Sequence, residues 1–279
     1  MVRAVILSLA GATTLLSTAA FAADLPPPLP PPVYHAPVVI EGGWYLRGFV
    51  GMSNQFVDNI SHPSFATAPL FVFLDKGGFD SAPFAGGGIG YQWNNWFRVD
   101  ATVEYRGKAN FHALDRFFNP FLFSGPAFNT NQYTASKSEL VALVNGYIDL
   151  GTWWCITPFV GAGFGVAYNK IEHFRDVNVI AGGGGWADTG TQTNFAWALH
   201  AGAAYKVTPN FAVELSYRYL NLGKAQTGLL VNLDPTVSSG NPLNPVTFNN
   251  LQSHDIMLSM RWMLQQEIPA PPPPLMRKG

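Results

Sequence analysis

FRVDATVEYR, residues 97–106, decides the fold of this chain, because apolar and polar residues alternate along it without a break. The odd-numbered positions share one face and are apolar: Phe97, Val99, Ala101, Val103 and Tyr105. The even-numbered positions share the other face and are polar: Arg98, Asp100, Thr102, Glu104 and Arg106. A helix would spread these charges around its circumference, whereas a strand places them on one side. The segment therefore predicts a β-strand with one apolar and one charged face.

Seven further segments repeat this alternation over about ten residues each: 44–52, 83–93, 140–150, 158–169, 195–206, 211–220 and 253–264. Their connections alternate between short and long. The short ones are 94–95, 151–156 and 207–210, and the long polar ones, expected as external loops, are 54–80, 108–137, 171–192 and 222–250. This pattern is typical of a membrane barrel. We therefore predict an all-β fold, an eight-stranded antiparallel up-and-down transmembrane β-barrel, too narrow for an aqueous pore.

Six of the eight tryptophans fall at the short-turn end of the predicted strands: Trp44, Trp93, Trp96, Trp153, Trp154 and Trp262. Such a one-sided cluster predicts an aromatic girdle at a membrane interface. Alternation alone would also fit a soluble β-sandwich or a lipocalin-like barrel, which buries its apolar face. The tryptophan cluster, the unequal loop lengths and an export signal favour the membrane.

The composition supports an exported barrel. Charged residues make up 12% of the chain, about half the share of an average soluble domain, while aromatics reach 14% and glycines number 28. The net charge of −1 gives no indication of a nucleic-acid partner. The single cysteine, Cys155, cannot form an internal disulfide, and we interpret it as an incidental small apolar residue.

The two ends of the chain differ from the rest in composition. Residues 1–22 read as a signal peptide, with Arg3, an apolar core and a small-x-small cleavage site at Ala20 to Ala22. No later stretch of 18 apolar residues offers a spanning helix. A proline-rich spacer (23–42), the barrel (43–264) and a proline-rich tail (265–279) follow.

The charged residues on the polar faces are expected inside the barrel. They carry both signs in similar numbers, and isolated buried charges are costly, so mutual pairing in a structural network is the expected arrangement. The network comprises Arg47, Arg98, Asp100, Glu104, Arg106, Asp149, Glu214, Arg218, Asp255 and Arg261. Glycines on the same face should leave room for long neighbouring side chains. They are Gly86, Gly88, Gly90, Gly161, Gly163 and Gly165.

Catalytic and metal-binding patterns are absent from the sequence. His62, His112 and His173 fall in three different predicted loops and are the candidate haem ligands, because imidazoles commonly bind metals. His200 is expected inside the barrel without a serine partner, so an enzyme acting on membrane lipid is less well supported. We expect no metal site and no catalytic residues.

Four motifs resemble the alphaproteobacterial outer-membrane surface-antigen family, which is part of the opacity-protein-like group of eight-stranded barrels. They are Gly43-Trp44-Tyr45-Leu46-Arg47-Gly48, the run from Asn145 to Trp153, Thr157 to Gly163, and Tyr217-Arg218-Tyr219-Leu220-Asn221. The resemblance covers most of residues 43–264. It implies abundant surface antigens, envelope integrity and host contact, with haem binding in some members. Many such barrels end on an aromatic residue, whereas this last strand ends near Leu264.

The sequence thus predicts a non-enzymatic surface protein of a Gram-negative outer membrane, acting in envelope integrity and host or surface contact through its external loops. The expected partners are outer-membrane lipid and lipopolysaccharide, the barrel-assembly machinery and a host surface ligand. Two alternatives stay open: a haem-binding outer-membrane protein, and a barrel enzyme acting on outer-membrane lipid.

Overall fold

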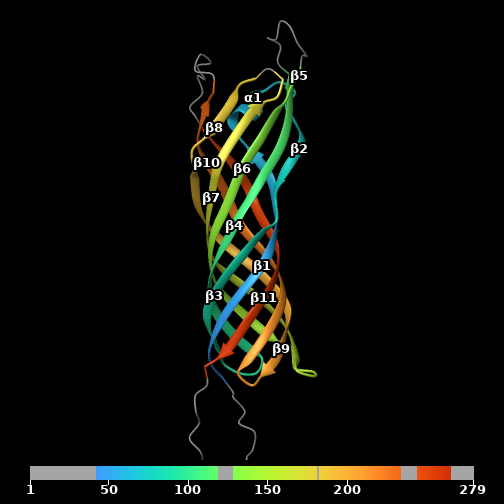
Figure 1. Ribbon diagram of the computed structural model, residues 1–279, viewed down its shortest axis with the longest axis vertical. Helices are drawn as coiled ribbons and strands as arrows, with labels where there is room; N and C mark the ends of the chain where they lie inside the picture. The colour runs from blue at the N-terminus through green and yellow to red at the C-terminus, as the bar shows by residue number, and fades with distance from the viewer. Residues whose placement is uncertain (1–41, 119–127, 181, 234–243, 265–279) are drawn as a thin grey trace, which may run out of the picture. The chain divides into compact units, whose positions relative to one another are not determined.

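The computed structural model describes residues 42–118, 128–180, 182–233 and 244–264, which form one closed β-barrel (Figure 1). The predicted signal peptide, the proline-rich tail and all of the spacer except residue 42 lie outside the described residues. No helix in the described part is long and apolar enough to cross a membrane.

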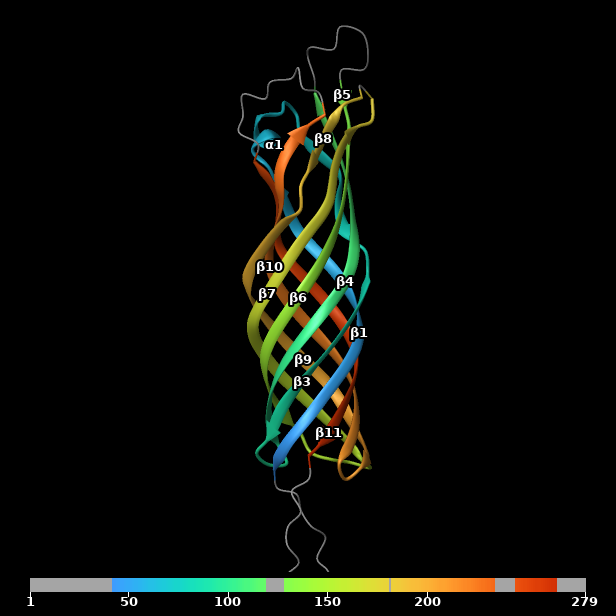
Figure 2. The same cartoon turned by 60° about the vertical axis from the view of Figure 1, so that its left-hand side comes forward.

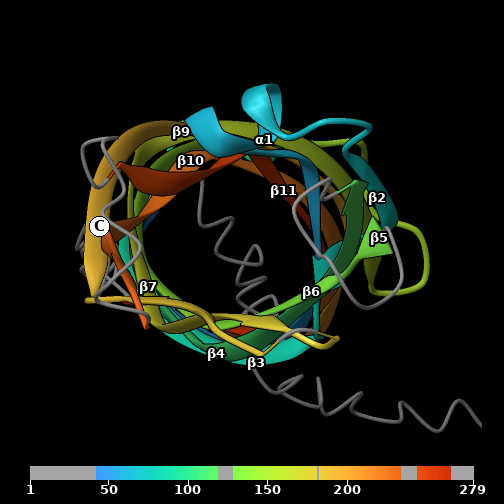
Figure 3. The same ribbon diagram turned by 90° about the horizontal axis from the view of Figure 1, so that it is seen from above.

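Eight long antiparallel strands make the ring in the described part of the chain, as the sequence predicts (Figure 3). They are β1 (Gly43–Ser61), β3 (Ala82–Gln92), β4 (Phe97–Phe118), β6 (Asn131–Asp149), β7 (Ile156–Asn178), β9 (Gly190–Thr208), β10 (Phe211–Asn232) and β11 (Pro245–Met263). Each strand pairs with its sequence neighbour, and β11 pairs back onto β1, with Arg47 opposite Arg261. Because the ring is closed, no strand edge is left open to lipid.

Short elements complete the wall at one end of the barrel, which we call the mouth end (Figure 2). β2 (Val72–Phe79) pairs with β4, in the position that β3 occupies nearer the opposite end. β8 (Gly184–Ala187) pairs with both β7 and β10, in the position that β9 occupies nearer the opposite end. β5 (Phe128–Asn129) pairs with the end of β4, and α1 (Pro63–Thr67) follows β1. The opposite end carries the short turns, and we call it the turn end.

The prediction of four long loops is wrong for most of their length. Strands β1, β4, β7 and β10 continue through much of 54–80, 108–137, 171–192 and 222–250, and the neighbouring strands return through the same segments. The barrel wall is therefore taller than the eight predicted segments, and most of the added wall lies toward the mouth end.

The outer surface of the barrel near the turn end is apolar. A first ring of exposed aromatic residues surrounds the turn end and includes all six predicted tryptophans. A second ring lies about ten residues further along the strands and contains Tyr105, Tyr168, Trp197 and Tyr217. Exposed aliphatic side chains such as Val103 fill the belt between them. Two aromatic girdles around an apolar band are the mark of a membrane-spanning barrel.

Beyond the second girdle the two faces of the wall exchange character. On β4 the outward residues become Lys108, Asn110 and His112, while Phe111 and Ala113 turn inward and are buried. The interior of the mouth half is an apolar core that includes Phe79, Phe111, Phe174, Leu222 and Phe248. This is the pattern of a barrel surrounded by water, in which burial of apolar surface stabilises the fold. One continuous wall thus combines a membrane barrel with a water-facing barrel.

Bulges explain why the sequence pattern was lost in the mouth half. The pairing register shifts at three places: between Arg106 and Ala109 on β4, at His173 on β7, and around Gly223 on β10. His173 and Gly223 have φ angles of 54° and 74°. Each bulge inserts a residue and so changes which numbers point inward, from even to odd on β4. A period of two counted from the turn end therefore fails at these positions.

The sequence predicts that inward glycines make room for long neighbouring side chains, and two of them do so for tyrosines. A Cβ atom at Gly90 would lie 2.2 Å from Cζ of Tyr45, and one at Gly161 would lie 2.5 Å from Cδ1 of Tyr147. Both tyrosines are buried and contact the charged residues of the lumen.

Candidate functional site

The structure places all ten candidate network residues in the interior, each with at least one ion pair. They divide into two groups along the barrel. The lower cluster, nearer the turn end, contains Arg47, Arg98, Asp100, Asp149, Glu214 and Arg261. Glu214 is at its centre, with its carboxylate oxygens 3.0–3.3 Å from three guanidinium groups. The guanidinium of Arg98 also stacks 4.3 Å from the ring centre of Tyr147.

The upper cluster contains Glu104, Arg106, Lys137, Glu139, Arg218 and Asp255. Arg218 donates to both oxygens of Glu104 at 2.7 Å and from Nε to Asp255 at 2.9 Å. Arg106 donates to Glu139 at 2.9 Å and to both oxygens of Asp255 at 2.9 Å. Both guanidinium groups lie about 5 Å from the ring centre of Phe84.

Each cluster holds three acidic and three basic side chains, so each is electrically neutral. This balance matters because a buried charge without a partner is strongly destabilising. Lys137 and Glu139 were missed by the sequence reading, which began this strand at Leu140. Continuing the alternation of 140–150 by two steps would have placed both residues in the lumen.

The three candidate haem ligands do not converge, and the assignment to loops is wrong for His112 and His173, whereas His62 lies between β1 and α1. His62 precedes α1, where its side chain accepts from the backbone amide of Ser64. His112 and His173 lie on β4 and β7 with exposed side chains on the outer wall. Among the described residues, no three His, Cys, Asp or Glu side chains are grouped closely enough to hold a metal ion. The geometry therefore gives no haem or metal site built from these histidines.

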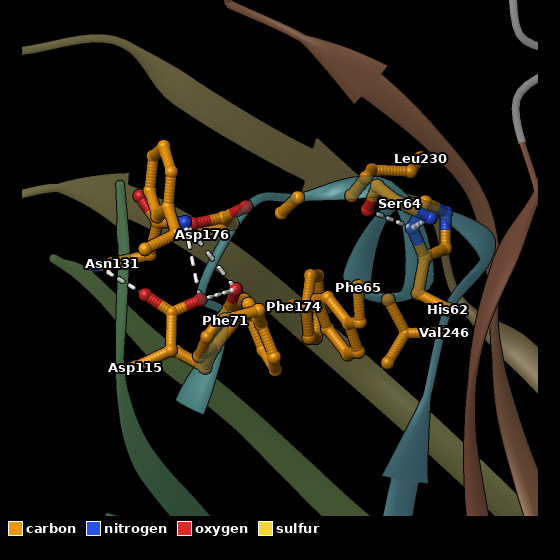
Figure 4. Close-up of a pocket in the computed structure, with 13 residues that line it drawn as sticks. His62, Ser64, Phe65, Phe71, Asp115, Asn131, Phe174, Asp176, Leu230 and Val246 are labelled. Atoms are coloured by element: carbon orange, nitrogen blue, oxygen red, sulfur yellow. Dashed lines mark hydrogen bonds between the residues drawn. The ribbon is translucent and has the colours of Figure 1, made fainter. Parts of the chain in front are cut away.

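A pocket of about 170 Å³ opens at the mouth end, under α1 (Figure 4). Aromatic rings form much of its lining: Phe65, Phe71, Phe117, Tyr133 and Phe174. Phe65 stacks on Phe71 with ring centres 4.7 Å apart and meets Tyr133 edge-on at 6.0 Å. Nothing in the sequence pointed to this pocket, because α1, β4, β6 and β7 contribute to it from distant parts of the chain.

Two carboxylates lie on one side of this mouth pocket, and His62 lies on the other (Figure 4). Asp115 is buried and accepts from the hydroxyl of Tyr133 at 2.5 Å and from the amide of Asn131 at 2.8 Å. Asp176 Oδ1 is shielded from solvent and has no hydrogen-bond partner in the described part of the chain. Aromatic rings together with carboxylates form a suitable environment for a cationic group.

The carboxyl of Asp176 should contribute to the pH dependence of the stability of the mouth end. Burial, and then the charge of Asp115, raise the pKa of this carboxyl from 3.8 to about 7. A raised acid pKa means that Asp176 favours the folded state most below pH 4, and that this contribution is lost as the pH rises to 7. Asp176→Asn should remove this pH-dependent loss of stability, which amounts to at most about 4 kcal/mol in the free energy of unfolding. Urea unfolding of the wild type and of Asp176→Asn at pH 4.5 and pH 8 measures this difference. Equal pH dependence of the two proteins would contradict the prediction.

A closed barrel with two aromatic girdles, an apolar belt and a charged lumen defines a bacterial outer-membrane β-barrel protein. Residues 8–259 match the model of the outer membrane protein beta-barrel domain family, and the chain belongs to that family.

Relatives of this chain include both uncharacterised and adhesin-like proteins. An uncharacterised protein of Brucella abortus is 29% identical over 222 residues, which cover 70% of this chain and 71% of the relative. A putative adhesin of Rickettsia prowazekii is 26% identical over 235 residues, covering 80% and 88%. Among solved structures, OprG of Pseudomonas aeruginosa aligns with a TM-score of 0.43 and 13% identity, covering 80% of this chain and 97% of that one.

Proposed function

We propose that this protein is a non-enzymatic surface-contact protein whose mouth end projects from the outer membrane and binds a target outside the cell. The observation that carries the proposal is the exchange of faces beyond the second girdle, which makes the mouth half a folded structure built for water. The short turns lie at the turn end, and so do the beginning and the end of the barrel segment, where the amide of Leu264 donates to the carbonyl of Trp44. Outer-membrane barrels keep such turns on the periplasmic side.

The mouth pocket is the proposed contact point. It is at the end of the barrel furthest from the turn end, and its carboxylates and aromatic rings suit a basic side chain of a partner protein. The similarity to a putative adhesin of Rickettsia prowazekii supports a role in attachment. The two neutral clusters support a structural role for the lumen residues, which would hold the barrel closed and so contribute to envelope integrity.

Neither alternative function gains a specific observation. His112 and His173 lie on the outer wall and not with His62, which disfavours haem. His200 is buried in the lumen, where it contacts the side-chain oxygen of Asn145 at 3.1 Å and the ring of Tyr147. These neighbours give it the role of a packed lumen residue.

Attachment can be tested by displaying the protein on a non-adherent laboratory strain and counting bacteria bound to cultured epithelial cells. The wild type should raise binding several-fold over the empty strain. Ala68→Trp, which fills the mouth pocket, should abolish most of this gain. Asn95→Trp at the exposed turn end is the matched control and should bind like the wild type. Folding is checked in parallel by heat-modified migration on a gel, and surface display by protease added to intact cells.

Three results would contradict the proposal. The first is a displayed wild type that binds no better than the empty strain, and the second is an Ala68→Trp variant that binds as well as the wild type. An equal loss for Asn95→Trp would show that the mouth end is not the contact surface.

A further inference from the structure

One side of the mouth half carries most of its outward positive charge. Lys108, His112 and Arg116 on β4, with Lys170, His173 and Arg175 on β7, form what we call the basic face. Glu172 is the one outward carboxylate among the described residues of β4, β6 and β7 beyond the second girdle. The basic face therefore carries four permanent positive charges and one negative charge.

Strand register places these residues close together. β6 separates β4 from β7, and His112 lies opposite Thr134, which lies opposite Arg175. Adjacent strands are about 4.8 Å apart, so cations on β4 and β7 are separated by about 10 Å across the wall. Lys108 and Lys170 both reach Glu172, at 3.1 Å and 2.6 Å. The outward residues of β6 between them are small and polar: Thr134, Ser136 and Ser138.

Carboxylates border the basic face on its β2 side. Exposed Asp75 on β2 and Asp80 after β2 lie next to β4, because β2 pairs with β4 and Asp80 accepts from the side-chain amide of Asn110 at 3.3 Å. Asp58 is exposed further round the wall, on β1. The excess of positive charge is thus limited to β4 and β7 and is not a general property of the surface of the barrel.

The basic face begins where the membrane belt ends. Lys108 follows Tyr105 by three residues and Lys170 follows Tyr168 by two, about 7–10 Å along each strand. Side chains at this height meet the head groups of the leaflet, and Arg175 and Arg116 lie further out. No ion pair of Arg175 is found with any described residue, and Arg116 lies over the ring of Phe128. These cations are available to an anionic partner.

We propose that the basic face binds the phosphorylated sugar head group of lipopolysaccharide in the outer leaflet. The acyl chains would lie against Val103, Leu140 and Val166 below, and phosphate groups would contact Lys108, Lys170 and Arg175. Lysine and arginine make strong charge-assisted hydrogen bonds to phosphate. The inference rests on the orientation in the proposed function, because lipopolysaccharide occupies the outer leaflet.

The test uses native mass spectrometry of the full-length protein folded in a zwitterionic detergent and titrated with a phosphorylated Kdo2-lipid A. The triple variant Lys108→Glu/Lys170→Glu/Arg175→Glu should weaken binding at least about 10-fold. The neutral variant Lys108→Gln/Lys170→Gln/Arg175→Gln should weaken it less, and it provides a second measurement if the first variant folds poorly. Dephosphorylated lipid should bind weakly to the wild type and to all variants.

Lys206→Glu is the matched control, since this lysine is exposed at the turn end, away from the basic face. It should bind phosphorylated lipid like the wild type. The proposal is overturned if both triple variants bind like the wild type, if the control loses as much, or if removing the phosphates changes nothing. This binding is measured without cells. Failure of the proposed attachment function and failure of lipid binding can therefore be distinguished.

Discussion

Replacing Arg218 with methionine should destabilise the barrel by about 3–5 kcal/mol, because it leaves buried carboxylates without their cation. Arg218 donates to both oxygens of Glu104 and to Asp255, and these carboxylates are 2% and 0% exposed. Methionine keeps much of the side-chain volume, so the loss reports mainly on charge. Urea unfolding from lipid vesicles measures it as a change in the free energy of unfolding.

The matched control restores neutrality in the upper cluster. Glu104→Gln alone should also be costly, since Arg106 and Arg218 then share fewer anions. The double variant Arg218→Met/Glu104→Gln removes one charge of each sign and should lose less than the sum of the single losses. Additive losses, or a loss below about 1 kcal/mol for Arg218→Met, would show that the clusters do not act as neutral units.

Replacing Val103 with arginine should cost about 1–3 kcal/mol, because a charge on the lipid face costs about 2–4 kcal/mol at the middle of the membrane and less toward its edges. Val103 is 53% exposed on the outer wall and lies inside the apolar belt. His112→Arg places the same side chain on the same strand and the same outer face, but beyond the second girdle. It should change the free energy of unfolding little, because its surroundings are aqueous.

Both variants are compared with the wild type by urea titration in the same vesicles. Equal losses for Val103→Arg and His112→Arg would mean that the membrane covers both positions. No loss for either would mean that neither position contacts lipid. Only a large loss at Val103 with a small one at His112 agrees with a belt that ends near Tyr105.

The membrane half of the fold was predictable because its alternation is uninterrupted. From Phe97 to Arg106 every outward residue but one small alanine is a large apolar side chain, and every inward residue is polar, so period and polarity agree. The ten interior residues of the candidate network follow from the same rule. Their pairing into two neutral clusters depends on contacts between distant strands, such as Arg106 with Asp255, and needed the structure.

The mouth half was not predictable in this way for two reasons. Bulges at Gly107, His173 and Gly223 change the parity of the inward positions, and the outward face changes from apolar to polar. Either change alone would weaken a search for alternating strands, and together they imitate polar loops. The mouth pocket could not be predicted from the sequence, because Asp115 and Asp176 come from separate strands and line the pocket together only in the folded barrel.

The position of the membrane boundary on β4 can be measured with a spin label at single cysteines, after Cys155, exposed at a turn, is replaced by serine. Labels at positions 99, 101 and 103 of the vesicle-embedded barrel should be accessible to oxygen and protected from a water-soluble nickel reagent. Labels at positions 110, 112 and 116 should show the reverse, with the crossover between 105 and 108. Oxygen accessibility that continues past 112 would contradict a barrel whose mouth half lies in water.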